Sequence, residues 1–199
     1  MILGVTGSIA SGKSETAKYF GSLGAFCIDA DVVAKDLTCK DKPALQEIIE
    51  VFGNAILSAE GSLDRKKLAD IIFSDFNAKL KLEKILHGRI ISQIEELISN
   101  KISEYKVIVI NAPLLFETGL DRLCDKVVVV TLPYNIQVQR LKLRDELSDD
   151  EIKKRIESQM SLEDKVKRAD FLVDNSVSKD DLKKHIENIY KLCKSSNTY

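Results

Sequence analysis

The sequence predicts an α/β fold with a five-stranded parallel sheet flanked by helices, and three observations support that prediction. Five short apolar runs are continuous rather than alternating, which is typical of strands covered on both faces. Helical patterns separate the runs, so we expect parallel strands joined by right-handed crossovers. The first run leads directly into a glycine-rich stretch that opens a helix, and such a turn surrounds an anion with backbone N–H groups.

The spacing of the predicted strands is uneven. About 76 residues lie between the second and the third, far more than one crossover connection needs. The excess is therefore expected to form structure of its own. The five predicted strands cover residues 2–6, 25–29, 106–111, 126–131 and 171–174.

The glycine-rich stretch fits the pattern G-x-x-x-x-G-K-[ST] of a phosphate-binding loop, so we expect a sheet of the P-loop NTPase type that binds ATP or GTP. Its glycines allow the N–H groups to turn inward. Lys13 can reach the β- and γ-phosphates, and the Ser14 hydroxyl is the usual Mg²⁺ ligand. The alternative, a surface turn, is disfavoured because a strand precedes and a helix follows. The predicted nucleotide contacts are Ser8, Ile9, Ala10, Ser11, Gly12, Lys13, Ser14 and Glu15.

Residues 35–103 are predicted to form a helical insertion in a nucleotide-binding core that comprises residues 1–34 and 104–199. Within it, Asp64 suits the N-cap of one helix. Apolar residues then recur at helical spacing over 76–98. The long interval is thus an inserted unit and not a linker.

Two carboxylates follow the second strand. In a doubly wound sheet the ligand crevice opens at the carboxyl ends of the strands, so Asp29 and Asp31 should face the phosphate loop. We predict Asp31 as the catalytic base, because a residue on the first turn of the next helix can project over the crevice. Asp29 is predicted to bind Mg²⁺ together with Ser14. The alternative is that one of these carboxylates merely caps the helix.

The third predicted strand ends in Asn111, where a nucleotide hydrolase often has an acid that contacts Mg²⁺. Metal binding should therefore depend more on Ser14 and on the pair Asp29 and Asp31. Beyond it, Leu114 and Leu115 are predicted to form an apolar shelf on which a substrate ring or chain could lie. Ordinary loop packing is the alternative for each.

A charged helical segment covers residues 134–168. Arg140 and Arg144 lie one helical turn apart, and guanidinium groups bind phosphate bidentately and stabilise charge on a phosphoryl group in transfer. We expect a lid over about 140–165 that closes over the nucleotide. A solvated helix with i,i+4 ion pairs is the alternative, and it is favoured for most other charges in the segment. His87, alone in the insertion, is more often structural than functional.

The bulk composition limits the partners and the location. The net charge is −1, so no basic field favours nucleic acid. No apolar run approaches the roughly 20 residues that span a bilayer, and the N-terminus is used as a strand, so we expect no membrane partner and a cytoplasmic location. The four cysteines form no C-x-x-C pair, which favours buried or inert thiols over a zinc site or disulfides. A monomer is the favoured oligomeric state.

Several motifs together resemble the dephospho-CoA kinase family, in order from residue 1 to about 176. Many families share the phosphate loop, whereas Ile-Asp-Ala-Asp at 28–31 combined with Pro-Leu-Leu-Phe-Glu at 113–117 is much more specific. The other matching segments are Leu63-Asp64-Arg65, Leu86-His87, the helix from Arg140 to Asp145 and residues 159–170.

The resemblance implies transfer of the γ-phosphoryl group of ATP to the ribose 3′-hydroxyl of dephospho-CoA, with Mg²⁺, in the last step of coenzyme A synthesis. It implies that Asp31 is the catalytic base, with Lys13 and Arg140 on the phosphates, and that the insertion binds the CoA substrate. The further contacts it implies are Arg144 and Asn175 to the nucleotide, Asn175 near the adenine, and Asp29, Arg65, His87, Leu114, Leu115 and Glu117 to the substrate.

Three positions depart from the family pattern: Ala10 stands where glycine is common, Glu15 where threonine is usual, and Gly88 where proline follows the histidine. None removes a group that the chemistry needs. A nucleotide-dependent switch is a rival function, but a GTPase would carry N-K-x-D and D-x-x-G, which the sequence lacks. A nucleoside or nucleotide kinase is another, although it shares the core and not the long insertion.

Overall fold

The computed structural model describes residues 1–145 and 148–195. The chain divides into two compact units. The core unit contains residues 1–29 and the residues from 98 onward, and the helical unit contains residues 30–97. The helical unit overlaps the predicted insertion of residues 35–103 but begins and ends about five residues earlier, and its role in substrate binding stays a prediction.

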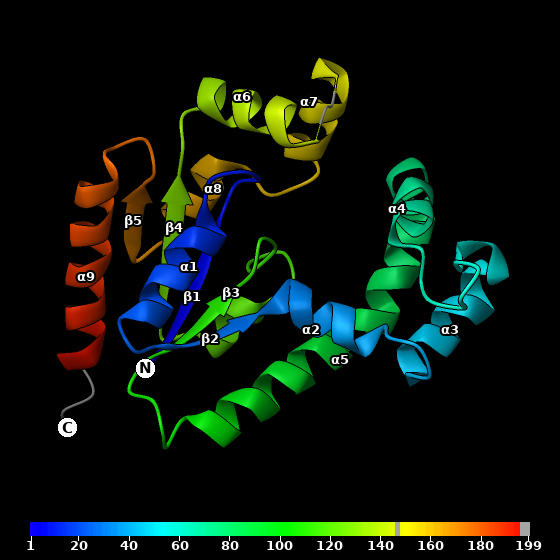
Figure 1. Cartoon of the computed structure of the whole chain (residues 1–199), viewed down its shortest axis with the longest axis horizontal. Coiled ribbons are helices and arrows are strands. Elements are labelled where there is room, and N and C mark those ends of the chain that lie inside the picture. The colour runs from blue at the N-terminus through cyan, green and yellow to red at the C-terminus, as the bar shows by residue number, and fades with distance from the viewer. Residues whose placement is uncertain (146–147, 196–199) are drawn as a thin grey trace. The chain divides into compact units, whose positions relative to one another are not determined.

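The sheet of the core unit confirms the predicted fold class, because all of its strands are parallel and helices connect them. It comprises β1 (Ile2–Gly7), β2 (Phe26–Asp29), β3 (Ile108–Asn111), β4 (Lys126–Thr131) and β5 (Phe171–Asp174). The strand order β2-β3-β1-β4-β5 puts β1 at the centre (Figure 1). At the carboxyl edge, Asn111 of β3 is in register with both Val5 of β1 and Asp29 of β2.

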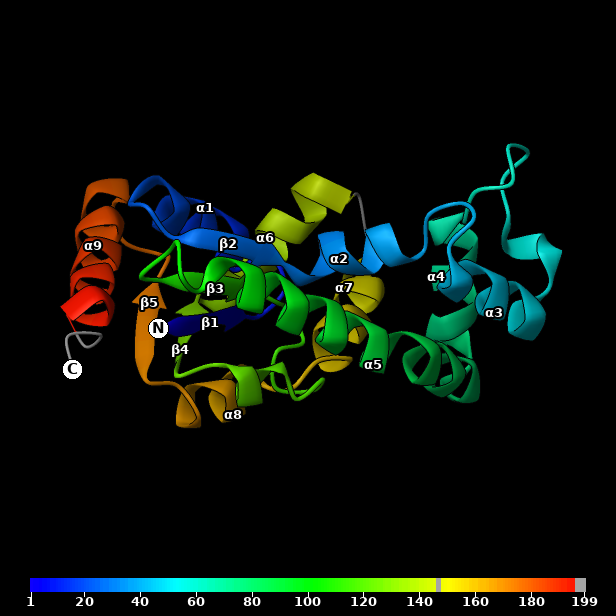
Figure 2. The same cartoon turned by 90° about the horizontal axis from the view of Figure 1, so that it is seen from below.

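Helices cover both faces of this sheet. On one face, α1 (Lys13–Ser22) and α9 (Lys179–Ser195) pack together, and α8 (Leu162–Lys167) lies on the other (Figure 2). Alternate strand side chains meet the first two helices, as Leu3 of β1 and Phe20 of α1 do in one fully buried cluster. Successive strand residues point to opposite faces, so covering both faces requires the continuous apolar runs seen in the sequence.

Two helices follow β4, where the sequence predicted a charged helical segment. They are α6 (Tyr134–Asp145) and α7 (Asp149–Glu157), and both stand beyond the carboxyl ends of β1 and β4 (Figure 1). A capping box opens α7: the Glu151 N–H donates to Ser148 Oγ at 3.4 Å, and the Ser148 N–H donates to the Glu151 carboxylate at 2.9 Å. Between β3 and β4 the chain forms the short 3-10 helix η2 (Leu120–Leu123).

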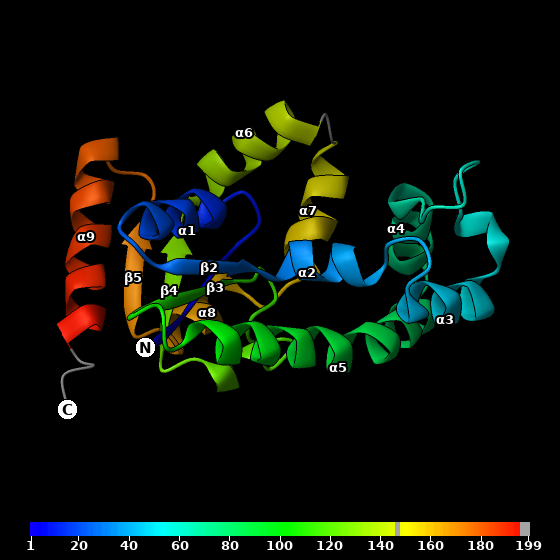
Figure 3. The ribbon, with the colours of Figure 1, turned by 60° about the horizontal axis from the view of Figure 1, so that its bottom comes forward.

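The helical unit has a small core of its own, and Figure 3 shows the helices that contribute to it. It consists of α2 (Ala30–Leu37), α3 (Pro43–Phe52), η1 (Asn54–Ile56), α4 (Arg65–Ser74) and the part of α5 (Phe76–Lys101) up to Leu97. Ile48 and Ile56 are fully buried, and Leu68 packs with them. Asp64 is the N-cap of α4, as predicted: its Oδ1 accepts from the N–H groups of Lys66 and Lys67 at 3.1 Å.

Across the residues that the structure describes, no helix is long and apolar enough to cross a membrane. All of the cysteines are free. Cys193 is buried in the core, whereas Cys27 and Cys39 are exposed, so of the two expected alternatives, buried or inert thiols, burial does not hold for these two.

Candidate functional site

The phosphate-binding loop connects β1 to α1, as predicted. Gly12 is the N-cap of α1 and has a φ of 92°, in the left-handed region that glycine adopts without the penalty of a Cβ. At Gly7 a Cβ would collide with the Val130 carbonyl oxygen of β4 and would lie 2.7 Å from Ser11 Oγ. Within the described residues no side chain caps α1. The positive N-terminal end of its helix dipole can therefore bind an anion.

Side chains from outside the loop hold three of its successive carbonyl groups. Two of the donors come from α6, and the third follows β5. The N–H and C=O of a peptide point in opposite directions, so carbonyls held outward turn the intervening N–H groups toward the concave side. The three bonds run from Gln137 Nε2 to the Ile9 oxygen at 2.8 Å, from Arg140 Nη1 to the Ala10 oxygen at 3.3 Å, and from Asn175 Nδ2 to the Ser11 oxygen at 2.7 Å.

Gln137 is a positioning residue that the sequence analysis missed. Its side chain is 3% exposed, and it lies three residues before Arg140 on the same face of α6, a spacing that could have indicated a shared target. Asn175 was placed near the adenine by the family resemblance. The structure puts its amide against the loop, where it fills the space that a Cβ on Gly12 would need. A contact between Asn175 and adenine stays a prediction.

Ala10 carries backbone strain in the middle of the loop. Its φ is 60°, in the left-handed region that residues with a Cβ avoid. A non-glycine residue there costs on the order of 1 kcal/mol. The position where the family commonly has glycine therefore has the backbone conformation that favours glycine, even though alanine occupies it.

A cavity of about 510 Å³ opens beside the start of α1, and we call it the donor cavity. The loop and α1 form one wall, and α6 forms the other. The structure thereby brings together seven of the residues predicted to contact the nucleotide or its phosphates. These residues in the lining of the donor cavity are Ala10, Gly12, Lys13, Ser14, Glu15, Arg140 and Arg144.

Ion pairs orient the second arginine of this cavity. The Asp145 carboxylate accepts two bonds of 2.8 Å from Arg144, and Arg155 Nη1 lies 3.2 Å from it. The hydrogen bond with Arg144 lowers the pKa of the Asp145 carboxyl and raises the pKa of the Arg144 guanidinium. Because Arg144 is largely exposed, this pairing contributes orientation more than stability.

The predicted metal ligands lie at the carboxyl edge of the sheet. Asn111 Nδ2 donates to Asp29 Oδ2 at 2.7 Å and to Ser14 Oγ at 3.4 Å, so it links the two. The other amide atom, Asn111 Oδ1, is buried and has no hydrogen-bond partner in the described part of the chain. An unpaired buried oxygen is costly unless a ligand donates to it.

This oxygen-rich set fits Mg²⁺, which prefers hydroxyl, carboxylate and water ligands and keeps several of its waters. A water on the metal could donate to Asn111 Oδ1. The described residues include no group of three or more His, Cys, Asp or Glu side chains placed to hold a metal, so the fit is to a hydrated ion and not to a dedicated cage.

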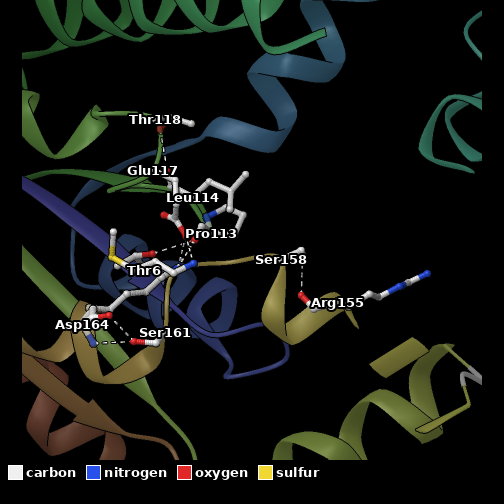
Figure 4. Close-up of polar contacts among 11 residues, drawn as sticks. Thr6, Pro113, Leu114, Glu117, Thr118, Arg155, Ser158, Ser161 and Asp164 are labelled. Carbon is white, nitrogen blue, oxygen red and sulfur yellow. Dashed lines mark hydrogen bonds and ion pairs between the residues drawn. The ribbon is translucent and has the colours of Figure 1, made fainter. Parts of the chain in front are cut away.

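A partly buried network engages Glu117, whose side chain is 22% exposed. Lys165 Nζ of α8 lies 3.2 Å from Glu117 Oε1 and donates to the Pro113 carbonyl oxygen at 2.8 Å. The Met160 N–H donates to the same carboxylate oxygen at 2.8 Å. Figure 4 shows Glu117 and Pro113 facing the segment that ends α7 and begins α8, near Ser161.

The network joins the loop after β3 to the base of the predicted lid. Lys165 is fully buried, and burial lowers its pKa although the Glu117 carboxylate opposes that shift. The interpretation of Lys165 as part of a solvated helical face is therefore wrong. A contact of Glu117 with substrate stays a prediction, and the structure gives its carboxylate a role in packing.

Only part of the apolar shelf predicted after β3 is accessible to a substrate. Leu115 is fully buried, and its Cδ2 would lie 2.7 Å from a Cβ built on Gly4 of β1, so its side chain faces the core. A shelf would therefore have to be formed by Leu114, which is half-buried. Thr6, at the end of β1, donates from Oγ1 to the Pro113 carbonyl oxygen at 3.3 Å and so fixes the start of this loop.

The helical unit carries the remaining predicted residues. Asp31 is exposed on the first turn of α2, and His87 is half-buried on α5. Arg65 Nη2 donates to Thr38 Oγ1 at 2.7 Å and to the Lys35 carbonyl oxygen at 3.1 Å, so it ties the start of α4 to the end of α2.

A cavity of about 350 Å³ lies inside this unit, with Lys42 and Arg89 in its lining. Gly88 also lines it, and a Cβ at Gly88 would meet nothing within 4 Å. The change from proline to glycine at this position therefore removes no packing that the structure uses.

Known proteins similar to this chain agree on one family. The sequence profile of the dephospho-CoA kinase family matches residues 1–181. A dephospho-CoA kinase of Fusobacterium nucleatum is 43% identical over 187 residues, which cover 94% of this chain and 95% of that protein. Among solved structures, a Thermus thermophilus protein has a TM-score of 0.82 at 31% identity, covering 96% of this chain and 97% of the other. A dephospho-CoA kinase from Campylobacter jejuni has a TM-score of 0.74 at 32% identity, covering 99% and 98%.

Proposed function

The chain belongs to the dephospho-CoA kinase family, and from that membership we infer that it transfers the γ-phosphoryl group of ATP to the ribose 3′-hydroxyl of dephospho-CoA. The products are ADP and coenzyme A, so the reaction is the final step of coenzyme A synthesis. The observation that carries this function is the family match over residues 1–181, which spans most of the core unit and the whole helical unit.

We propose that the donor cavity binds ATP. The loop amides and the N-terminus of α1 would hold the β-phosphate, and Lys13 would reach the γ-phosphate. Arg140 would stabilise charge on the phosphoryl group in transfer. Arg140 now bonds to the carbonyl oxygens of Ala10 and Asn175, and that placement beside the loop supports its role.

We propose that Asp31 accepts the proton of the attacking 3′-hydroxyl. Its position on the first turn of α2, two residues beyond Asp29 at the carboxyl edge of the sheet, supports this role. The helical unit would hold the rest of the substrate, with Arg65 and His87 among its contacts and the cavity beside Arg89 available for part of it. The cation Lys42 suits the diphosphate of dephospho-CoA, and Arg89, which now pairs with Glu47, would have to exchange that partner to bind it.

We propose that Mg²⁺ binds next to Ser14 and Asp29. When bound, the ion would neutralise charge on the β- and γ-phosphates. In this chain, the Ser14 hydroxyl would bind the ion directly, Asp29 would bind it directly or through water, and Asn111 would hold both side chains in place. The unpaired Asn111 Oδ1 supports this proposal.

We also propose that the protein is cytoplasmic and a monomer. Its net charge of −1 favours neither nucleic acid nor an anionic surface as a partner. Light scattering coupled to gel filtration gives the oligomeric state directly. A mass of about 22 kDa would agree with the proposal, and twice that mass would contradict it.

Release of ADP measured with different acceptors tests the function. Dephospho-CoA should support turnover, whereas AMP, nucleosides and a blank without acceptor should give little. A rate that is independent of the acceptor would favour a nucleotide-dependent switch. A preference for AMP or a nucleoside would favour a nucleotide or nucleoside kinase.

A further inference from the structure

A second cavity, of about 550 Å³, reaches the phosphate-binding loop at its first residue, and we call it the Ser8 cavity. It lies within the core unit. Its walls come from the loop, from the chain between β4 and α6, and from the connection of α7 to α8. The residues that matter below are Ser8, Leu132, Tyr134, Gln159 and Met160.

Two polar side-chain atoms on these walls are buried and have no hydrogen-bond partner among the residues described. They are Ser8 Oγ and Gln159 Oε1. Ser8 as a whole is only 7% exposed. Buried oxygens are normally paired, because an unpaired one loses its water and gains nothing in return. Both residues line the same cavity, so one ligand that enters it, with a small turn of these side chains, can satisfy both atoms.

The loop defines which substrate lies on this side. The donor cavity touches the loop at Ala10 and Gly12 and continues along α1 to Glu15, the end that cradles the α- and β-phosphates. An acceptor must attack the γ-phosphoryl group roughly in line, from the side opposite the β-phosphate. The Ser8 cavity meets the loop at its other end. It is therefore placed on the acceptor side of the loop.

The chemistry of the walls selects one part of the acceptor. Leu132 and Met160 offer apolar surface, and Tyr134 offers a ring that is 60% exposed. Glu157 and Glu163 also line the cavity, and these carboxylates oppose the diphosphate of dephospho-CoA. A neutral, flat group that carries an N–H donor for Gln159 fits best. The adenine of dephospho-CoA is such a group, and it is attached to the ribose that bears the reacting 3′-hydroxyl.

We propose that the Ser8 cavity binds the adenosine end of dephospho-CoA and that Gln159 recognises the adenine base by hydrogen bonding. Gln159 Oε1 accepts from the 6-amino group of adenine, as one half of the pairing that glutamine makes with adenine in other complexes. Ser8 Oγ bonds to a ribose hydroxyl beside the γ-phosphate. The inference rests on the proposed function, which supplies the acceptor, and it adds the pocket and the residue that determine base specificity.

Steady-state kinetics with two acceptors test the proposal. One is dephospho-CoA, and the other is its purine analogue, in which hydrogen replaces the 6-amino group. The wild-type protein should use the analogue with a kcat/KM about tenfold lower, because Gln159 Oε1 is then left without a donor. In Gln159→Met, which keeps the length of the side chain, KM for dephospho-CoA should rise about tenfold and the two acceptors should differ by less than about twofold.

Matched variants separate base reading from a general loss of packing. Gln139→Met changes an exposed glutamine of α6 outside this cavity and should keep the wild-type preference. Gln159→Glu retains an acceptor oxygen at nearly the same volume, so it should also keep a preference for the 6-amino group. KM for ATP should stay within about twofold of wild type in Gln159→Met, Gln139→Met and Gln159→Glu.

Three results would overturn the proposal. The first is a preference for the 6-amino group that is unchanged in Gln159→Met. The second is a rise in KM for ATP instead of dephospho-CoA, which would assign the cavity to the donor base. The third is loss of that preference in Gln159→Glu to the same extent as in Gln159→Met. Failure of the proposed function itself looks different, because the wild-type protein would then not phosphorylate dephospho-CoA at all.

Discussion

Asn111→Asp is expected to make the stability of the protein depend on both pH and Mg²⁺. Asn111 Nδ2 donates to Asp29 Oδ2 at 2.7 Å, and the substitution puts a second carboxylate there with little change of shape. The lost hydrogen bond to a charged acceptor is worth about 1.5 to 3 kcal/mol. Two unit charges at 2.7 Å repel by about 6 kcal/mol at an effective dielectric constant of about 20.

Uptake of a proton limits that repulsion. Protonating an ordinary aspartate costs about 4 kcal/mol at pH 7 and about 1.5 kcal/mol at pH 5. One carboxyl of the pair should therefore have a pKa above its unfolded value, so the destabilisation grows as the pH rises above the unfolded pKa. Solvent reduces these figures because Asp29 is only half-buried. We expect a net loss of about 2 to 3 kcal/mol at pH 7 and about half of that at pH 5.

Urea denaturation with and without Mg²⁺ measures this effect. The ion should restore most of the lost stability in Asn111→Asp at pH 7, because it neutralises the two carboxylates. Asn111→Ala is the matched control: it loses the same hydrogen bonds without adding charge, so its deficit should change little with pH or Mg²⁺. Stability of Asn111→Asp equal to wild type at pH 7 without Mg²⁺, or a deficit that the ion does not reduce, would refute the reasoning.

Three further predictions concern the loop, the base and the buried network. Asp31→Asn should lose most of kcat and leave ATP affinity largely unchanged, since it removes a proton acceptor and no contact to the donor; unchanged turnover would exclude Asp31 as the base. Ala10→Gly should raise the free energy of unfolding by up to about 1 kcal/mol, because φ at this position is 60°, and a lower melting temperature would show that the alanine is not strained. Glu117→Gln should lower the free energy of unfolding by about 3 kcal/mol, because Lys165 remains buried without its counter-charge. A loss below about 1 kcal/mol in chemical denaturation would show that the pair is solvated.

The fold and the loop could be predicted because their signals are local. The continuous apolar runs, the glycines at fixed spacing and the N-cap at Asp64 each depend on a few neighbouring residues, and the structure confirms all three. The long interval between two strands also predicted an inserted helical unit.

Residues that act over long sequence distances were missed. Gln137 bonds to Ile9, which lies 128 residues away, and Lys165 reaches Pro113 across 52 residues. Nothing near Lys165 in the sequence distinguishes it from the solvated lysines around it, because its burial depends on which face of α8 meets the loop after β3. Leu115 was misjudged for the same reason, since the approach of its loop to Gly4 is a property of the folded sheet.

The central claim is that this protein phosphorylates the 3′-hydroxyl of dephospho-CoA, and the direct measurement is the structure of the product. Mass spectrometry and phosphorus NMR after reaction with ATP and dephospho-CoA should show one added phosphate on the ribose 3′-oxygen, in equal amount to the ADP formed. ADP formation without that product, or a phosphate at any other position, would contradict it.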